Sequence, residues 1–366
     1  MERTISVFIP SLAGGGAERV MVNLCNGFIQ RGYEVDMVLL ERSGPYLADM
    51  SPEVRVVDLK KSSVRAGVLP LAHYLRSASP DVMFSALDHA NLGALIARLV
   101  ARGSTRVIPT VHTSHMVPGR KSSFHETALV PLLRWLYPSA DAIVGVSQGV
   151  AEDVAVRFRV PRPKVRLIYN PVITPRMHLL AVEPVDHPWL ENQEVPVVVA
   201  VGRLTAAKDY PTLLAAARLL RQRRAVRLLI LGEGEERPNL ERLVESLGLG
   251  EDVSLPGFVD NPFRYVARAS AFVLSSAWEA LPTALIEALA LGIPIVSTAC
   301  QNGPAEILQG GRFGRLVPVG DADALADAID QAIGSPPVEI PTEVLEPFTV
   351  DGALDRYESL LAELIP

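Results

Sequence analysis

The chain has 366 residues, of which 49% are hydrophobic and 21% charged, so it is long enough for two domains and has the balance of a globular protein. Its two cysteines exclude a disulfide-stapled fold and a cysteine-rich metal site, and its net charge of −6 argues against a general nucleic-acid binder. No targeting signal and no run of about 18 uncharged apolar residues occur, so we expect a cytoplasmic chain without a membrane-spanning helix.

The first 172 residues alternate apolar strand signals with segments of helical length. A helix is expected over Ala17–Gln30, because Val20, Leu24 and Phe28 recur one turn apart and Gly32 follows as a stop signal. The alternation predicts a parallel sheet with helices on both faces. The expected strands are Ile5–Ile9, Val35–Leu40, Val54–Leu59, Val82–Ser85, Val107–Thr110 and Ala142–Val146.

Residues 173–196 hold four prolines and little periodicity, which is typical of a linker between domains. A second strand–helix series occupies residues 197–349, and a last helix is expected over Val350–Leu364. The sequence therefore predicts two doubly wound α/β domains in tandem. The strands expected in the second series are Val197–Val201, Arg227–Leu231, Val253–Leu255, Ala271–Leu274, Ile293–Ser297 and Arg315–Val317.

The most informative motif follows the strand Ala271–Leu274, at the sheet edge where such folds bind ligands. Pro282 suits the first position of a helix that ends before Gly292. The backbone N–H groups of Leu281, Thr283 and Ala284 would then be available to a phosphate. Glu279 lies before this helix and Glu287 within it, and they either flank one ligand or are a capping acid and a solvated glutamate.

Glycines and cations follow two other strands of the same series. Gly202 allows a close turn after Val197–Val201, and Arg203 and Lys208 place two positive charges where a diphosphate would bind, unless both are surface cations. Gly232 and Gly234 follow Arg227–Leu231, and we interpret them as a tight turn near a ligand's base.

The first domain contributes a Gly14-Gly15-Gly16 loop after its first strand and His112 after its fifth. The loop lacks the Gly-Lys-Ser/Thr ending of a P-loop and the third spaced glycine of a dinucleotide site, but it allows close approach to a ligand. His112 and His115 have a spacing that can bind zinc, yet no carboxylate or thiol set accompanies them. We therefore expect a hydrogen-bonding histidine and no metal.

Charge is divided unevenly along the chain. Residues 1–170 hold 20 Lys and Arg against 14 Asp and Glu, whereas residues 171–366 hold 15 against 27. A basic segment with Arg120 and Lys121 precedes the apolar run Leu129–Tyr137, which fits either a bilayer surface or a core helix. Lys60, Lys61 and Arg65 add to the basic character of this half.

Taken together, these motifs resemble those of the group 1 retaining glycosyltransferases, whose signature is two glutamates separated by seven residues, here Glu279 and Glu287. The resemblance covers nearly the whole chain and is strongest in the second domain. The other matching segments are Gly15-Gly16-Ala17-Glu18-Arg19, Tyr169-Asn170-Pro171, Gly202-Arg203 with Lys208-Asp209, Gly232-Glu233-Gly234, Pro256-Gly257 and Gly303-Pro304-Ala305-Glu306-Ile307-Leu308.

This resemblance implies the GT-B fold: two Rossmann-like doubly wound domains that face a cleft, with the C-terminal helix 350–366 returning to the N-terminal domain. The C-terminal domain would hold a nucleotide sugar, expected to be a UDP-sugar, and the N-terminal domain a glycan or lipid-linked acceptor. Transfer would proceed with retained configuration and without a cofactor or metal, for cell-surface polysaccharide or glycolipid synthesis. The basic half would favour peripheral contact with the inner face of the membrane, and no nucleic acid would bind.

The resemblance also implies roles for individual residues. Arg203 and Lys208 would hold the diphosphate, Glu287 the ribose and Glu279 the sugar hydroxyls, with the backbone N–H groups of Ala280 and Leu281 nearby. His112 would hydrogen-bond the sugar, and Gly15 and Gly16 would let their loop close on the ligands. Relatives often have glycine where this chain has Ala280, whose methyl group would narrow the sugar pocket or shift its loop.

Two other functions remain open at this point. A nucleotide-sugar epimerase or hydrolase on a related fold would consume the donor without an acceptor. A catalytically inactive sugar-nucleotide-binding subunit would bind the donor and leave it unchanged.

Overall fold

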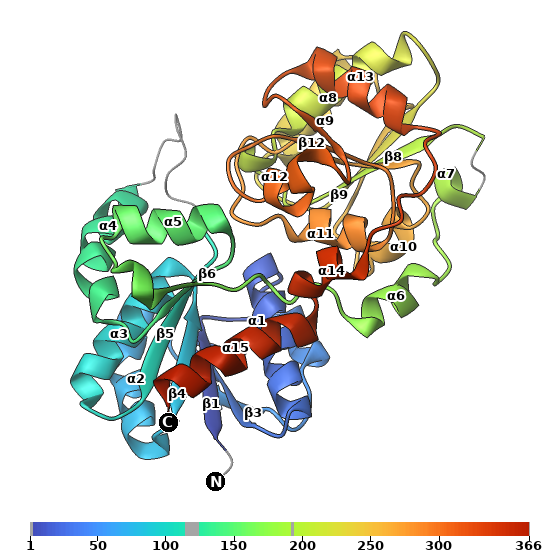
Figure 1. Ribbon diagram of the computed structural model, residues 1–366. Coiled ribbons are helices and arrows are strands. Elements are labelled where there is room, and N and C mark those ends of the chain that lie inside the picture. Colours follow the sequence, from blue (N-terminus) through green and yellow to red (C-terminus); the bar gives the residue numbers. More distant parts are fainter. Residues whose placement is uncertain (1–2, 114–123, 192–193, 366) are drawn as a thin grey trace. The chain divides into compact units, whose positions relative to one another are not determined.

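The computed structural model describes residues 3–113, 124–191 and 194–365; of residues 124–128 it describes the backbone only. Contacts divide the chain into two compact units, each built on its own parallel sheet (Figure 1). Unit 1 comprises Met1–Val172 together with Glu346–Pro366, and unit 2 comprises Ile173–Leu345.

Unit 1 is organised around a seven-stranded parallel sheet of order β3-β2-β1-β4-β5-β6-β7. The strands are β1 (Thr4–Ile9), β2 (Glu34–Leu39), β3 (Arg55–Asp58), β4 (Val82–Ala86), β5 (Arg106–Val111), β6 (Ile143–Gly145) and β7 (Val165–Leu167). The first six agree with the expected strands to within a few residues. The three-residue edge strand β7 was not predicted, because Val165-Arg166-Leu167 is too short to show an alternating pattern.

In unit 1 the helices α1, α3 and α5 contact the strands of this sheet. In α1, Val20, Leu24 and Phe28 are all at most 2% exposed, which confirms the spacing read from the sequence. The helices are α1 (Gly16–Gln30), α2 (Val64–Ala78), α3 (Asp88–Ala101), α4 (Phe124–Leu136), α5 (Gln148–Arg157) and α15 (Val350–Leu364), with 3-10 turns η1 (Pro45–Asp49), η2 (Tyr137–Ser139), η3 (Arg162–Lys164) and η6 (Glu346–Phe348).

Unit 2 repeats this plan with a six-stranded parallel sheet of order β10-β9-β8-β11-β12-β13. The strands are β8 (Val197–Val201), β9 (Arg227–Leu231), β10 (Val253–Gly257), β11 (Ala271–Leu274), β12 (Ile295–Thr298) and β13 (Arg315–Val317). The helices are α6 (Pro175–Ala181), α7 (Pro188–Glu191), α8 (Tyr210–Arg221), α9 (Arg237–Ser246), α10 (Phe263–Val266), α11 (Thr283–Ala290), α12 (Pro304–Ile307), α13 (Ala322–Ala332) and α14 (Thr342–Leu345), with 3-10 turns η4 (Ala206–Lys208) and η5 (Gln309–Gly311).

The segment expected to be a linker is in fact part of unit 2. It contains α6 and α7, and α6 packs against α10. Asn261 Nδ2 donates to the backbone oxygen of Leu180 over 2.8 Å, and the Arg227 guanidinium lies 5.1 Å from the Trp189 ring centroid. Two of the four prolines, Pro175 and Pro188, begin these short helices, because proline is well tolerated in the first helical turn.

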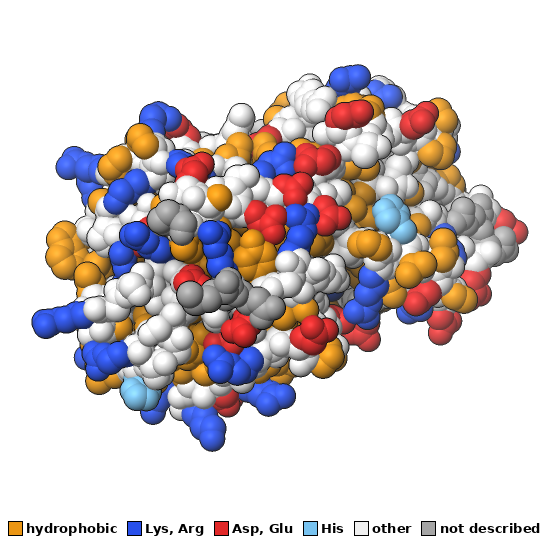
Figure 2. All heavy atoms as spheres, turned by 60° about the horizontal axis from the view of Figure 1, so that its bottom comes forward, with side chains coloured by type: hydrophobic (Ala, Val, Ile, Leu, Met, Phe, Trp, Pro, Cys, Tyr) orange, Lys and Arg blue, Asp and Glu red, His pale blue; other side chains and the backbone are white. Residues whose placement is uncertain are grey.

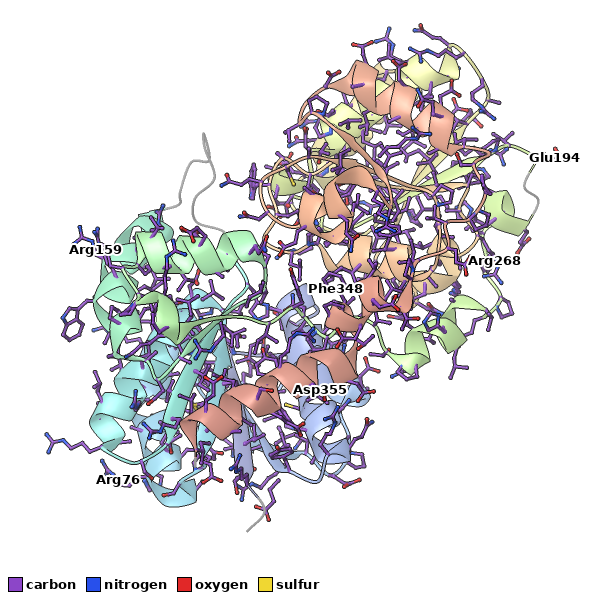
Figure 3. The ribbon with its side chains drawn as sticks, in the orientation of Figure 1. Arg76, Arg159, Glu194, Arg268, Phe348 and Asp355 are labelled. Atoms are coloured by element: carbon purple, nitrogen blue, oxygen red, sulfur yellow. The ribbon has the colours of Figure 1, made fainter. Side chains whose placement is uncertain are left out.

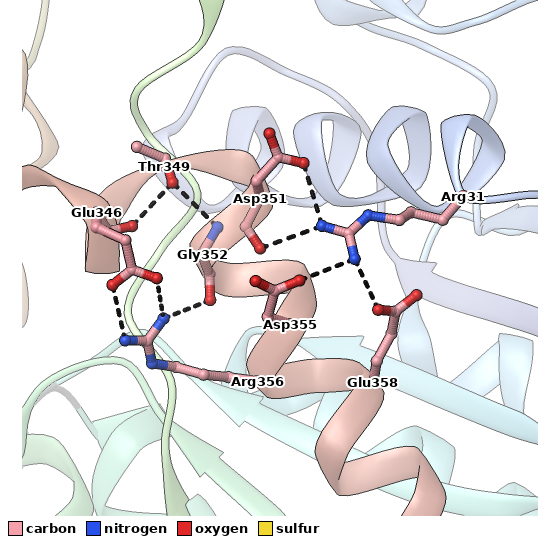
Figure 4. Close-up of polar contacts among 8 residues, drawn as sticks. All are labelled: Arg31, Glu346, Thr349, Asp351, Gly352, Asp355, Arg356 and Glu358. Carbon is pink, nitrogen blue, oxygen red and sulfur yellow. Dashed lines mark hydrogen bonds and ion pairs between the residues drawn. The ribbon is translucent and has the colours of Figure 1, made fainter.

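The C-terminal helix α15 returns to unit 1, as expected, and packs beside α1 (Figure 1). The return begins at Glu346 rather than at 350, and it places Phe348 (labelled in Figure 3) against Tyr169, with 4.9 Å between ring centroids. Figure 4 shows the polar side of this contact. Arg31 reaches three carboxylates, of Asp351, Asp355 and Glu358, at 2.7–3.1 Å.

Gly352 near the start of α15 provides a test of this packing. Alanine in a helix is favoured over glycine by about 1 kcal/mol, but a Cβ at Gly352 would lie 2.1 Å from the backbone oxygen of Glu346. Overpacking of this kind costs about 1–3 kcal/mol, so Gly352→Ala is expected to lower the urea midpoint of unfolding. The matched Gly103→Ala, whose Cβ would meet nothing closer than 4.0 Å, should leave the midpoint unchanged. An unchanged or higher midpoint for Gly352→Ala would contradict the packing of α15.

Candidate functional site

The strand order of unit 2 creates a topological switch point between β8 and β11. From β8 the chain proceeds to β9 on one side, and from β11 it proceeds to β12 on the other. Loops at the carboxyl ends of two such strands separate and leave a crevice for ligands. Here the loop after β8 carries Gly202, Arg203 and Lys208, and the loop after β11 carries Glu279. Two of the motifs read separately in the sequence therefore lie on either side of one switch point.

Lys208 and Glu279 meet directly across this switch point. The Lys208 ammonium lies 2.6 Å from Glu279 Oε1, and the two side chains are only 18% and 13% exposed. The backbones of the loops are also joined, because the Ala277 N–H donates to the Ala207 oxygen at 2.8 Å and the Ser275 hydroxyl to the Lys208 oxygen at 2.7 Å. A short ion pair shielded from water thus links the two loops.

The Ser276 side chain also binds the Glu279 carboxylate. Its hydroxyl donates to Glu279 Oε1 at 2.7 Å, and its own backbone oxygen accepts from the Thr298 hydroxyl at 2.6 Å. Ser276 and Thr298 are almost fully buried. Sequence reasoning did not identify Ser276, although its three-residue spacing from Glu279 was a usable signal. Lys208 and Ser276 both bind Oε1 of Glu279, and among the described residues no partner is found for Oε2, which can therefore accept a further hydrogen bond.

The negative charge of Glu279 contributes to raised pKa values of two neighbouring groups. Burial, and then the Glu279 carboxylate, raise the pKa of the Cys300 thiol to about 12. The same two causes, in the same order, raise the pKa of the Tyr210 hydroxyl above its ordinary range. Cys300 and Tyr210 are therefore neutral at physiological pH and add no charge beside the Lys208–Glu279 pair.

This pairing changes the expected electrostatics of the site. The sequence predicted two cations ready for a diphosphate, but Lys208 is already compensated by Glu279. Arg203 is exposed, and within the described ranges no ion-pair partner is found for its guanidinium. Arg203 and Lys208 are thus in different electrostatic states, because only Lys208 lies on the η4 turn that faces the loop after β11.

The glycines of unit 2 pack the loops against one another. A Cβ at Gly232, whose φ is +146°, would lie 2.0 Å from the Gly202 oxygen, and a Cβ at Gly234 would lie 2.3 Å from the Leu204 oxygen. Backbone hydrogen bonds join the same segments, including that from the Leu204 N–H to the Glu233 oxygen at 2.8 Å. These positions require glycine for backbone contact within the protein, and Gly202, against which Gly232 packs, in turn lies next to the Lys208 side chain.

The helix α11 begins one residue later than expected. Its first residue is Thr283, and Pro282 is the N-cap in extended conformation instead of the first helical residue. Pro282 is fixed there by Gly303, where a Cβ would come within 2.4 Å of the proline ring. The first N–H groups of the helix still have no intrahelical acceptor. Glu287 is buried in α11, at 8% exposure, while Ala280 and Thr283 are partly exposed and Leu281 is buried.

The candidate site residues of unit 1 follow the carboxyl ends of the strands β1 and β5. Gly15 is the N-cap of α1 without a side-chain cap, and Gly16 is its first residue. His112 directly follows β5, and its Nε2 lies 2.9 Å from the Thr110 hydroxyl. Burial lowers the pKa of His112 to about 4, against a smaller raising effect of the Asp88 charge, so its imidazole is neutral at pH 7.

Some sequence predictions fall outside the described part of the chain. His115, Arg120 and Lys121 lie outside the described residues. Within the ranges that the structure describes, no three His, Cys, Asp or Glu side chains group as a metal site, and no helix is long and apolar enough to cross a membrane.

Comparison with known proteins matches both units to glycosyltransferase families. Residues 183–342 match the family model described as glycosyl transferases group 1, and residues 14–176 match that of glycosyltransferase family 4. The lipopolysaccharide core biosynthesis glycosyltransferase of Rhizobium meliloti is 30% identical over 325 residues, 87% of this chain and 86% of its own length. A Campylobacter jejuni enzyme is 29% identical over 334 residues, 88% of this chain and 87% of its own length; its name is N-acetylgalactosamine-N,N'-diacetylbacillosaminyl-diphospho-undecaprenol 4-alpha-N-acetylgalactosaminyltransferase.

Solved structures show the same fold at lower sequence identity. The Anabaena protein HepE in complex with UDP-glucose has a TM-score of 0.82 at 19% identity, covering 98% of this chain and 99% of its own. A glycosyltransferase from Rickettsia africae has a TM-score of 0.80 at 16% identity, covering 100% and 99%. With two parallel α/β units, each matched by a glycosyltransferase family model, and with relatives aligned over most of its length, the chain belongs to the group 1 glycosyltransferases and has the GT-B fold.

Proposed function

We propose that this glycosyltransferase moves a sugar from a nucleotide-diphosphate sugar, specifically a UDP-sugar, to a hydroxyl of a lipid-linked or polysaccharide acceptor, with retained configuration and without a metal. The observation that carries the proposal is the Lys208–Glu279 pair at the switch point of unit 2, with α11 starting four residues beyond Glu279. Relatives named for transfer to a diphospho-undecaprenol glycan and for lipopolysaccharide core synthesis support the acceptor class, and UDP-bound structural neighbours support the donor.

The chemistry requires negative charge to be stabilised on the leaving diphosphate. As the bond between the anomeric carbon and the phosphate oxygen breaks, Lys208, Arg203 and the N–H groups at the start of α11 would stabilise that charge. The acceptor oxygen then forms the new bond on the same face of the sugar, and its proton passes to the leaving phosphate oxygen. Glu279 Oε2 would orient the sugar by accepting from one of its hydroxyls.

The proposal is tested by incubating the purified chain with a panel of UDP-sugars and other nucleotide sugars. The true donor should raise the thermal unfolding midpoint most, because a ligand that binds only the native state stabilises it. NMR of the product formed with a lipid-linked acceptor should show retained anomeric configuration; an inverted product would overturn retention. Loss of donor without acceptor would favour the hydrolase or epimerase alternative, and donor binding without any turnover the inactive subunit.

A lipid-linked acceptor implies contact with a membrane surface, and we propose that unit 1 makes it through α4. On this helix Leu133 and Leu136 are buried, whereas Leu132 and Trp135 are 50% and 74% exposed, with the exposed Arg134 between them. Apolar and cationic side chains together are suited to an anionic bilayer surface. Figure 2 shows one face on which blue Lys and Arg side chains lie among orange apolar ones and red Asp and Glu ones in the left part of the view, where unit 1 lies.

Vesicle binding provides the measurement. The chain should co-sediment with vesicles that contain anionic lipid, and binding should weaken as salt screens the charges. Leu132→Ala should reduce binding several-fold, because it removes apolar area from the contact. The matched Leu179→Ala removes an even more exposed leucine, at 70%, from the acidic unit 2 and should have no effect. Equal loss in both variants, or no binding at low salt, would exclude α4 as the contact.

A further inference from the structure

A buried hydrogen-bond network lies beneath His112 in unit 1. It joins Ser85 of β4, Asn91 of α3, Thr110 of β5 and Tyr137 of η2, each of which is 0% exposed. Such a network is stable only when each of its polar groups is satisfied, and then it fixes its members in one arrangement. Nothing in the sequence motifs pointed to these four residues, because they are dispersed over 53 positions of unit 1.

The Thr110 hydroxyl determines which nitrogen of His112 carries the proton. A hydroxyl has a single hydrogen, and that of Thr110 is donated to the backbone oxygen of Ser85 over 2.8 Å. Towards His112 Nε2, 2.9 Å away, Thr110 can therefore only accept. Nε2 must then carry the proton, and in a neutral imidazole this leaves Nδ1 as an acceptor.

Asn91 fixes the position of Thr110. Its amide nitrogen donates to the Thr110 backbone oxygen at 3.0 Å and to the Tyr137 hydroxyl at 3.2 Å, and its amide oxygen accepts from the Ser85 hydroxyl at 2.7 Å. One side chain on α3 thus ties together the ends of β4 and β5. Since Ser85 also receives the Thr110 hydrogen, the direction of every bond in the network is consistent.

We infer that Thr110 is a positioning residue, which holds His112 in the tautomer with the proton on Nε2 so that Nδ1 accepts a hydrogen bond from a hydroxyl of the bound sugar or acceptor. The inference rests on the proposed function for its ligand class, and on unit 1 alone for its geometry. A neutral histidine with an unprotonated Nδ1 can accept a hydrogen bond from a hydroxyl group. Its unprotonated nitrogen would repel a phosphate oxygen, so the diphosphate is left to the cations of unit 2.

The tautomer is measured directly by NMR on the full chain labelled with ¹⁵N-histidine. The two ring nitrogens of a neutral imidazole have very different shifts, and the signals of His112 among the seven histidines are identified by their loss in His112→Gln. We expect the protonated nitrogen of His112 to be Nε2. A proton on Nδ1 would overturn the inference, and this result does not depend on whether any sugar transfer is found.

Three threonine variants test the role in catalysis. Thr110→Val keeps the shape but removes the acceptor, so we expect both tautomers of His112 to be populated and turnover to fall about tenfold. Thr110→Ser restores the hydroxyl and should restore both readouts. The matched control is Thr105→Val: Thr105 is equally buried, but its hydroxyl has no hydrogen-bond partner among the described residues.

The outcomes separate the inference from general damage to unit 1. Unchanged tautomer and turnover in Thr110→Val, or equal losses in Thr105→Val, would overturn the positioning role. Absence of transfer from the wild-type chain with every donor would refute the proposed function, while the tautomer of His112 in the wild-type, Thr110→Val and Thr110→Ser chains would still decide the inference.

Discussion

Lys208→Glu is expected to reduce sugar transfer about a hundredfold or more. The change removes a cation that, under the proposed function, binds the diphosphate, and it places a second carboxylate where the ammonium now lies 2.6 Å from Glu279. Both side chains are largely shielded from water, so the repulsion between them is weakly screened. UDP affinity, measured by calorimetry, should fall together with transfer.

Two further variants show whether this loss is local. Arg224→Glu reverses the charge of a half-exposed arginine that pairs with Asp330 in the same unit, and it should leave transfer unchanged. The double variant Lys208→Glu/Glu279→Lys rebuilds an ion pair with exchanged ends. It should recover the unfolding midpoint that Lys208→Glu loses, but not the transfer. Transfer at the wild-type rate in Lys208→Glu would remove Lys208 from the site.

Glu279→Gln should reduce transfer by about two to three orders of magnitude and have the opposite effect on UDP. The amide keeps the size of the side chain and an oxygen for the Ser276 hydroxyl, but it no longer compensates Lys208. The released ammonium is then fully available to the diphosphate, so UDP should bind the variant at least as tightly as it binds the wild type. Calorimetry for UDP and a transfer assay for the rate separate the two effects.

Glu241→Gln is the matched control for this change. Glu241 also forms an ion pair in unit 2, 2.9 Å from Arg237, but it is 51% exposed and lies on α9. Its replacement should alter neither UDP binding nor transfer. Weaker UDP binding in Glu279→Gln would show instead that the ion pair positions Lys208 for the diphosphate, contrary to the competition inferred from the structure.

The sequence was a good guide to the sheets and a poor one to contacts between distant loops. Buried parallel strands such as Val197–Val201 are continuous apolar runs, which are recognised without knowledge of their neighbours. The edge strand β7 has no such run. The strand β12 starts two residues later than expected, because the Ile293 N–H bonds the Ala288 oxygen at the end of α11 and Pro294 has no N–H to donate.

In the candidate site, too, the sequence did not reveal contacts between residues that are distant along the chain. Glu279 and Lys208 were each identified from local motifs, but the two are 71 residues apart and nothing local indicates that they are paired. The Thr110 network was missed because buried serine, threonine and asparagine in strands and helices do not form a motif. Their importance comes from the directions of hydrogen bonds, which only coordinates reveal.

Because α15 returns to unit 1, the core of unit 1 cannot be completed until the end of the chain has been synthesised. Ala353, Leu354, Tyr357, Leu360 and Leu361 are part of the same hydrophobic core as Phe28 and Phe84. A nascent chain that has emerged as far as residue 345 holds all of unit 2, yet it still lacks these five side chains of the unit 1 core. The core of unit 1 can therefore be completed only after unit 2 has been synthesised, and until then part of its apolar surface is exposed to chaperones.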